Sequence, residues 1–154
     1  MTLHFAYGSN MSRALMGARC PGATALGVAT LPGWRFMVNV DGVGSLAPQP
    51  GRLTYGVLWR LTPRDLAAIN AYEAVDTELY LRRTLPVRLG ARQAAALVYL
   101  ARRRGEGVAR PGYISLVVEA AREWQLPEAY IRSLQRLSPS RWRGARAKDT
   151  GELG

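Results

Sequence analysis

Short apolar segments separated by turn-forming residues occupy the first two-thirds of the chain. We expect strands over residues 3–7, 24–31, 34–40, 53–60, 82–89 and 93–100, with 45–47 as a short strand at best. Gly33, Gly90 and residues 41–42 and 48–51 supply the turns between them. Residues 55–59 are nearly all apolar, which indicates a central strand. The pattern therefore predicts a sheet of several short strands.

One helix is expected between the strands. Thr62 can cap it, Pro63 suits its first position, and the Asp65 carboxylate can meet the free N–H groups of the first turn. The helix should then run to about Glu73. A second helix start is expected at Ser12, after the loop that follows the first strand.

Two further helices are expected in the last third of the chain. Pro111 opens the first, to about Gln125, and Pro127 opens the second, to about Leu137. The apolar face of the first carries Tyr113, Val117, Ala120 and Trp124 at helical spacing.

This order of elements predicts an α+β fold, with a small mixed β-barrel or sheet and flanking helices. Periodicity leaves open whether the sheet closes. We expect one domain over residues 1–137, followed by a basic, loosely ordered tail over residues 138–154.

The 154 residues carry a formal net charge of +10, which raises the question of nucleic-acid binding. All but one of the 21 basic residues are arginine, and no aromatic pattern suited to base stacking accompanies them. We therefore expect a solvated basic surface rather than a nucleic-acid site. Without a long apolar run or a signal-peptide pattern, a cytoplasmic location and no membrane association are expected.

Counting residues argues against several catalytic designs. His4 is the single histidine and falls within the expected first strand, so a Ser-His-Asp or Cys-His relay is disfavoured. Cys20, the single cysteine, lies beside Pro21 with no evident activator. The acidic residues show no metal-ligand spacing, and no phosphate-binding loop is present. We expect neither a metal nor a cofactor.

The loop Tyr7-Gly8-Ser9-Asn10 joins the first strand to the helix that starts at Ser12. Its glycine and small polar residues can turn several N–H groups toward one point, where a carboxylate or an oxyanion would bind. A plain strand-to-helix turn is the alternative interpretation.

Glu73 is the acidic residue that stands apart. It follows Leu66 and Ile69 at helical spacing, so it continues an apolar stripe, where lost hydration should raise its pKa. Alternatively, the helix ends before Glu73, or its carboxylate pairs with Arg82. Tyr113 lies on a core-facing stripe, where its hydroxyl either packs in the core or points into a pocket.

Together these features suit proton transfer around a carbonyl, and they resemble the γ-glutamylcyclotransferase superfamily, including its plant avirulence-induced members. Four segments match in order: Phe5-Ala6-Tyr7-Gly8-Ser9-Asn10-Met11; Gly56-Val57-Leu58-Trp59 with the helix after it; Tyr72-Glu73-Ala74-Val75-Asp76 with Tyr80 and Arg82; and Pro111-Gly112-Tyr113 with Leu126-Pro127-Glu128-Ala129-Tyr130. The resemblance covers residues 3 to about 137.

The resemblance implies a small mixed barrel with flanking helices. It also implies a cofactor-free enzyme, a cyclising lyase or acyl transferase, that converts a small γ-glutamyl amide or amino acid to 5-oxoproline and an amine or amino acid. Glu73 would be the general acid and base. The backbone at Gly8, Ser9 and Asn10 would hold the glutamyl end, and Tyr7 would line the site. Tyr113 would hydrogen-bond near the α-carboxylate or the reacting centre.

Two positions depart from the family pattern, because Ala74 and Glu78 stand where glycine is common. Either change could alter the pocket for the leaving group or mark a protein that has drifted from the parent activity. The alternative to an enzyme is a non-catalytic binding module of the same fold, which binds an acidic partner or RNA through its basic surface. The sequence leaves open the leaving amine, a homodimer and the pathway.

Overall fold

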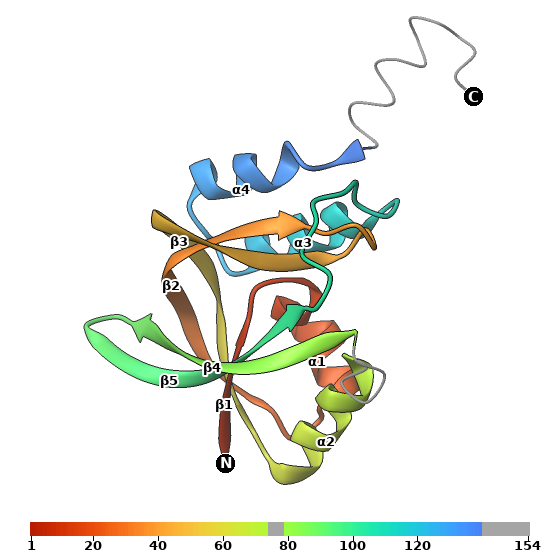
Figure 1. The fold of residues 1–154 in the computed structure, drawn as a ribbon. Coiled ribbons are helices and arrows are strands. Elements are labelled where there is room, and N and C mark those ends of the chain that lie inside the picture. Colours follow the sequence, from red (N-terminus) through yellow and green to blue (C-terminus); the bar gives the residue numbers. More distant parts are fainter. Residues whose placement is uncertain (74–78, 140–154) are drawn as a thin grey trace, which may run out of the picture.

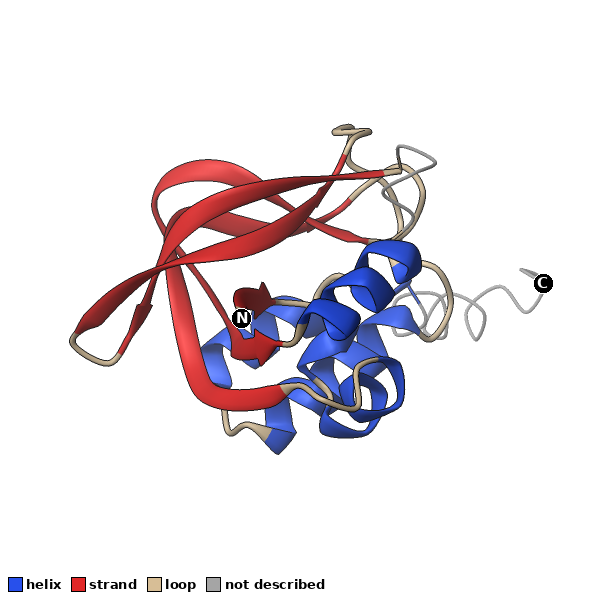
Figure 2. Cartoon of the chain, turned by 90° about the horizontal axis from the view of Figure 1, so that it is seen from below, coloured by secondary structure: helices blue, strands red, loops and turns tan. Residues whose placement is uncertain are grey.

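A computed structural model describes residues 1–73 and 79–139, which form a five-stranded barrel with helices gathered on one side (Figures 1 and 2). The strands are β1 Thr2–Ala6, β2 Thr24–Val38, β3 Gly44–Leu61, β4 Tyr80–Leu89 and β5 Arg92–Ala101. The helices are the 3₁₀ turn η1 Ser9–Met11, α1 Arg13–Arg19, α2 Pro63–Tyr72, α3 Tyr113–Glu123 and α4 Glu128–Gln135.

The barrel closes in the order β1-β3-β2-β4-β5. β1 runs antiparallel to β3, with Phe5 opposite Leu58, and β4 and β5 form an antiparallel hairpin. A parallel bridge between His4 and Leu97 joins β1 to β5 and completes the circuit. The prediction of an α+β fold with a small mixed barrel is thus confirmed.

The β2–β3 hairpin corrects the expected strand boundaries. Segments 24–31 and 34–40 belong to one strand, and the expected turn at 48–51 lies inside β3. Gly33 has a φ of 86°, and the register between the strands shifts between Pro32 and Trp34. These glycine- and proline-rich residues make an irregularity within two long paired strands rather than a connection between short ones.

The C-terminal helices pack against the loop that follows β1. Trp124, at the end of α3, donates its indole N–H to the carbonyl oxygen of Met11 at 2.7 Å. The same ring meets Trp59 of β3 edge to face, with ring centroids 6.2 Å apart. One aromatic side chain therefore fixes the position of η1 relative to both the barrel and α3.

Both C-terminal helices begin later than expected. Gly112 caps α3 in a left-handed conformation, with φ at 81°, so that helix starts at Tyr113 rather than at Pro111. Pro127 is likewise the residue before α4. On α3, Val117 and Ala120 are buried as the apolar pattern predicts.

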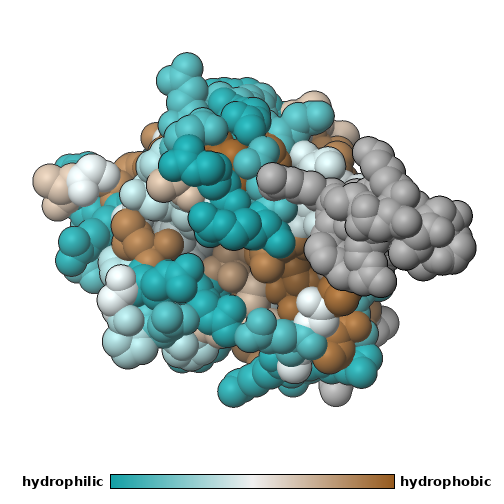
Figure 3. Space-filling view, turned by 90° about the horizontal axis from the view of Figure 1, so that it is seen from above, coloured by the Kyte–Doolittle hydropathy of each residue, from teal (hydrophilic) through white to brown (hydrophobic). Residues whose placement is uncertain are grey.

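Hydrophilic side chains cover most of the face seen from above Figure 1, with hydrophobic patches between them (Figure 3). Across residues 1–73 and 79–139, no helix is long and apolar enough to span a membrane. The expected tail at 138–154 falls largely on residues 140–154, and these lie outside the described part of the chain.

The start of α2 has the capping residues that the sequence predicts. These residues fix the direction of the helix, which ends beside Glu73. Thr62 Oγ1 accepts the Asp65 N–H at 3.1 Å, and the Asp65 carboxylate accepts the Thr62 N–H at 3.1 Å. Asp65 is buried and also accepts the Gly22 N–H at 3.1 Å, which ties α2 to the turn that follows α1.

Replacing Asp65 should therefore destabilise the fold more than a single helix cap does. We expect Asp65→Ala to lower the free energy of unfolding by about 2–3 kcal/mol, because the partly buried N–H groups of Thr62 and Gly22 lose their acceptor. Urea denaturation measures the change. The exposed neighbour Arg64→Ala should stay within about 0.5 kcal/mol of the wild type. Equal stability of the two variants would contradict the prediction.

Candidate active site

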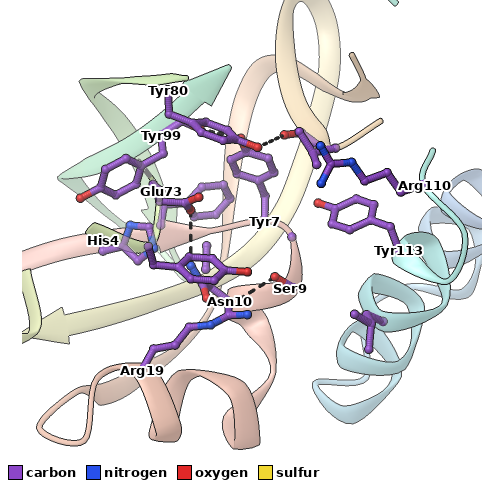
Figure 4. Close-up of a pocket in the computed structure, with 17 residues that line it drawn as sticks. His4, Tyr7, Ser9, Asn10, Arg19, Glu73, Tyr80, Tyr99, Arg110 and Tyr113 are labelled. Carbon is purple, nitrogen blue, oxygen red and sulfur yellow. Dashed lines mark hydrogen bonds between the residues drawn. The ribbon is translucent and has the colours of Figure 1, made fainter. Parts of the chain in front are cut away.

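A cavity of about 220 Å³ lies where the loop after β1, the end of α2, the barrel strands and the start of α3 meet (Figure 4). Its lining includes every residue proposed for the site from sequence: Tyr7, Gly8, Ser9, Asn10, Glu73 and Tyr113. It also includes residues that sequence reasoning did not assign to a site, notably His4, Arg19, Tyr99 and Arg110. The structure thus brings segments far apart in sequence to one place.

The loop from Tyr7 to Asn10 turns directly into the 3₁₀ helix η1. The first hydrogen bond of this turn runs from the Met11 N–H to the Gly8 carbonyl at 3.1 Å. As first residues of the turn, Ser9 and Asn10 have N–H groups without an acceptor inside the helix. A Cβ added to Gly8 would lie 2.9 Å from the hydroxyl oxygen of Tyr113, so glycine permits this close approach.

Glu73 lies at the end of α2, one residue beyond the last helical residue, Tyr72. Its backbone N–H still bonds to the Ile69 carbonyl at 2.9 Å, and its half-buried side chain lines the cavity. The helix does end before Glu73, as the alternative interpretation held. The Glu73 carboxylate nevertheless points into the cavity (Figure 4). Ala74 and Glu78 lie outside the described residues.

The surroundings of Glu73 set its proton affinity. Burial raises the pKa of its carboxyl to about 7, and the positive charge of Arg19 opposes that rise. Asn10 Nδ2 donates to Glu73 Oε2 at 3.5 Å. The described residues contain no ion pair between Glu73 and Arg82, the partner considered as an alternative.

Arg19 is a site residue that sequence reasoning missed. Its Nη1 donates to Asn10 Oδ1 and, at 3.4 Å, to Ser9 Oγ. Its guanidinium also stacks on the Tyr72 ring, 3.6 Å from the centroid. Arg19 therefore orients the Asn10 amide so that its nitrogen faces Glu73. Its position in the last turn of α1 offered no signal that would set it apart from the other arginines.

Besides Tyr72, four tyrosines line the cavity: Tyr7, Tyr80, Tyr99 and Tyr113. Tyr7 donates to the Tyr99 carbonyl oxygen at 2.5 Å, and the Tyr99 hydroxyl donates to Asn70 Oδ1. Burial raises the pKa of all four hydroxyls above the ordinary value for tyrosine. They therefore stay neutral and act as hydrogen-bond donors at physiological pH.

His4 lies in β1, as the sequence predicted, and Cys20 is buried directly after α1. Burial lowers the pKa of the His4 imidazole to about 4, so it is neutral, and its Nδ1 lies 3.2 Å from the Leu97 carbonyl oxygen. Burial raises the pKa of the Cys20 thiol to about 11, which disfavours the thiolate. Within residues 1–73 and 79–139, no cluster of three or more metal-ligating side chains occurs.

The cavity therefore combines one carboxyl group that titrates near neutral pH with neutral hydroxyl donors and a loop in which the Ser9 and Asn10 N–H groups have no acceptor within η1. Such a site can move a proton between two atoms of a bound molecule and can hold an anionic or carbonyl oxygen.

The chain is similar in sequence and in fold to known proteins. The model of the AIG2-like family matches residues 54–134, more than half of the chain. The γ-glutamylcyclotransferase of Mus musculus is 24% identical over 155 residues, covering 92% of this chain and 81% of that protein. The Homo sapiens γ-glutamylcyclotransferase is 22% identical over 164 residues, covering 98% and 86%. A solved structure of a γ-glutamyl cyclotransferase superposes with a TM-score of 0.83 at 23% identity, covering 90% of this chain and 88% of the other.

The contact between Gly8 and Tyr113 yields a test of the site geometry. We expect Gly8→Ala to lower the free energy of unfolding by about 1–2 kcal/mol, because its methyl group meets the Tyr113 hydroxyl. Adding Tyr113→Phe should recover most of that loss by removing the oxygen atom. Thermal denaturation of the single and double variants measures the coupling. Strictly additive effects would contradict the contact.

Proposed function

The chain belongs to the AIG2-like family, and on this premise we propose that it is a γ-glutamylcyclotransferase-type enzyme. It would convert a small γ-glutamyl amide or γ-glutamyl amino acid to 5-oxoproline and a free amine or amino acid. The observation that carries this proposal is the Glu73 carboxyl group, which titrates near neutral pH within a cavity bounded by the loop at residues 7–10.

The proposed reaction needs one group that accepts and returns a proton. As the neutral α-amine of the substrate attacks the γ-carbonyl carbon, its nitrogen loses one proton and becomes the ring amide. The C–N bond to the leaving group then breaks, and the leaving nitrogen gains one proton. Glu73 would first take a proton from the α-ammonium and release it to water. Once ionised again, it would carry the second proton from the attacking nitrogen to the leaving nitrogen. Since both reacting groups belong to one molecule, the cavity has mainly to hold the folded conformation of the substrate.

The remaining lining residues suit the binding of such a substrate. The N–H groups at Ser9 and Asn10 would hold the glutamyl end, with Tyr7 lining the site. Tyr113, kept neutral by burial, would donate to the α-carboxylate or near the reacting carbonyl. The cavity of about 220 Å³ is of a size for a small molecule. A γ-glutamyl adduct with a larger leaving amine would need only a different fit at the rim.

The decisive variant is Glu73→Gln, which keeps the shape of the side chain but removes its ability to titrate. We expect 5-oxoproline formation from a panel of γ-glutamyl amides and amino acids to fall by at least about a hundredfold. Chromatographic assay of 5-oxoproline measures the loss. In the wild type, kcat/KM should rise with pH through about 7, as Glu73 ionises. Full activity in the variant would rule out the assigned role.

The same variant should remain folded, and its stability provides an independent check. Because burial raises the pKa of Glu73 from 4.5 to about 7, the folded protein binds more protons between these pH values than the unfolded chain does. The unfolding free energy of the wild type should thus fall as pH rises over this interval. Glu73→Gln should lack that part of the slope, as urea titrations at several pH values can show. Identical slopes would mean that Glu73 is not desolvated.

Arg19 should lower the pKa of Glu73. Its positive charge favours the ionised form of Glu73, so Arg19→Met should shift the ascending limb of the kcat/KM profile to higher pH. Arg19→Lys, which keeps the charge, should restore part of the shift. The exposed Arg136→Met serves as a control for loss of one positive charge elsewhere. An unchanged midpoint in Arg19→Met would show that Arg19 does not act on Glu73.

A further inference from the structure

Arg110 lies on the rim of the cavity, between β5 and α3, and its guanidinium extends toward the space between Tyr80 and Tyr113 (Figure 4). Its charge acts on a cavity residue, since it lowers the pKa of Tyr80 against the larger effect of burial. The side chain is exposed on its outer side, so a bound molecule can reach it.

The loop at residues 39–44 holds Arg110 in place from both ends. Arg110 Nε donates to the Asp41 carbonyl oxygen at 2.9 Å, and the Arg110 N–H donates to the Gly42 carbonyl oxygen at 2.9 Å. Gly42 has a φ of 81°, and a Cβ there would lie 2.7 Å from Arg110 Cγ, so the stem of Arg110 packs on the glycine. The guanidinium is therefore held before any ligand arrives, which reduces the entropy lost on binding.

The positive charge of Arg110 is not neutralised by the acid nearest to it in sequence. The Asp41 carboxylate pairs with Arg103 at 2.6 Å, and only the backbone oxygen of Asp41 accepts from Arg110. Among residues 1–73 and 79–139, Arg110 forms no ion pair. The two Nη groups thus present a planar pair of donors, the geometry that binds a carboxylate with two parallel hydrogen bonds.

The other cavity arginine is differently placed. Arg19 uses Nη1 on Ser9 and Asn10 and stacks on Tyr72, beside the carboxylate that the reaction needs ionised. Its charge is therefore directed toward Glu73. Arg110 lies on the opposite side of the Tyr7–Asn10 loop, next to Tyr113 (Figure 4). The two cations serve different parts of the cavity.

We propose that Arg110 is a specificity-determining residue that binds a carboxylate of the substrate at the rim of the cavity. The inference rests on the proposed function and adds to its substrate a carboxylate within reach of the rim. That group is either the α-carboxylate of the glutamyl moiety or the carboxylate of a leaving amino acid. Both offer the same chemistry to the guanidinium.

Three matched substrates separate the two carboxylates: γ-glutamyl-alanine, its analogue with a carboxamide on the alanine, and its analogue with a carboxamide on the glutamyl α-carbon. Arg110→Met should lower kcat/KM for γ-glutamyl-alanine by about tenfold, chiefly through a higher KM. The analogue that lacks the bound carboxylate should be insensitive to the substitution, which identifies the partner. Arg110→Lys should restore part of the activity.

Arg104→Met is the matched control, because it removes one exposed arginine from the same segment without changing the cavity lining. It should leave all three rates unchanged. An equal loss with all three substrates, or no loss with any, would overturn the role of Arg110 while 5-oxoproline formation by the wild type still supports the proposed function. No turnover of any γ-glutamyl compound by the wild type would instead overturn the proposed function, and the role of Arg110 with it.

Discussion

The loss of hydration at the Glu73 carboxylate is the constraint around which the cavity is arranged. A carboxylate in water is ionised at neutral pH and takes up protons poorly, whereas burial against the barrel brings its pKa close to 7. Arg19 acts in the opposite direction and keeps the ionised form accessible. The balance between these two effects gives a group that can both accept and return a proton at neutral pH.

The scaffold holds this balance through contacts distant in sequence. Trp124 donates a hydrogen bond to the Met11 carbonyl oxygen at 2.7 Å, which fixes η1 and the loop before it. The capping box at Thr62 and Asp65 fixes the direction of α2. Gly8 lets the Tyr113 hydroxyl approach the loop closely. The charge beside the acid thus comes from Arg19 of α1, while burial in the cavity removes water from the carboxylate.

The sequence predicted the fold class and six of the residues that line the cavity, because local signals agreed with the fold at those places. The caps at Ser12 and Thr62 carry their own signals. Glu73 was found through its spacing from Ile69, although the helix ends one residue before it. The catalytic and binding roles given to these residues stay predictions.

Other features depend on tertiary contacts that no local pattern encodes. Residues 48–51 look like a turn but lie within β3, because pairing with β2 accommodates them at an irregularity. Arg19 and Arg110 resemble the many other arginines until the fold places them at the cavity. A direct titration of Glu73 tests the central claim: ¹³C NMR of its side-chain carboxyl, assigned by comparison with Glu73→Gln, should give a midpoint near pH 7. A midpoint near 4.5, the ordinary value for glutamate, would contradict the account.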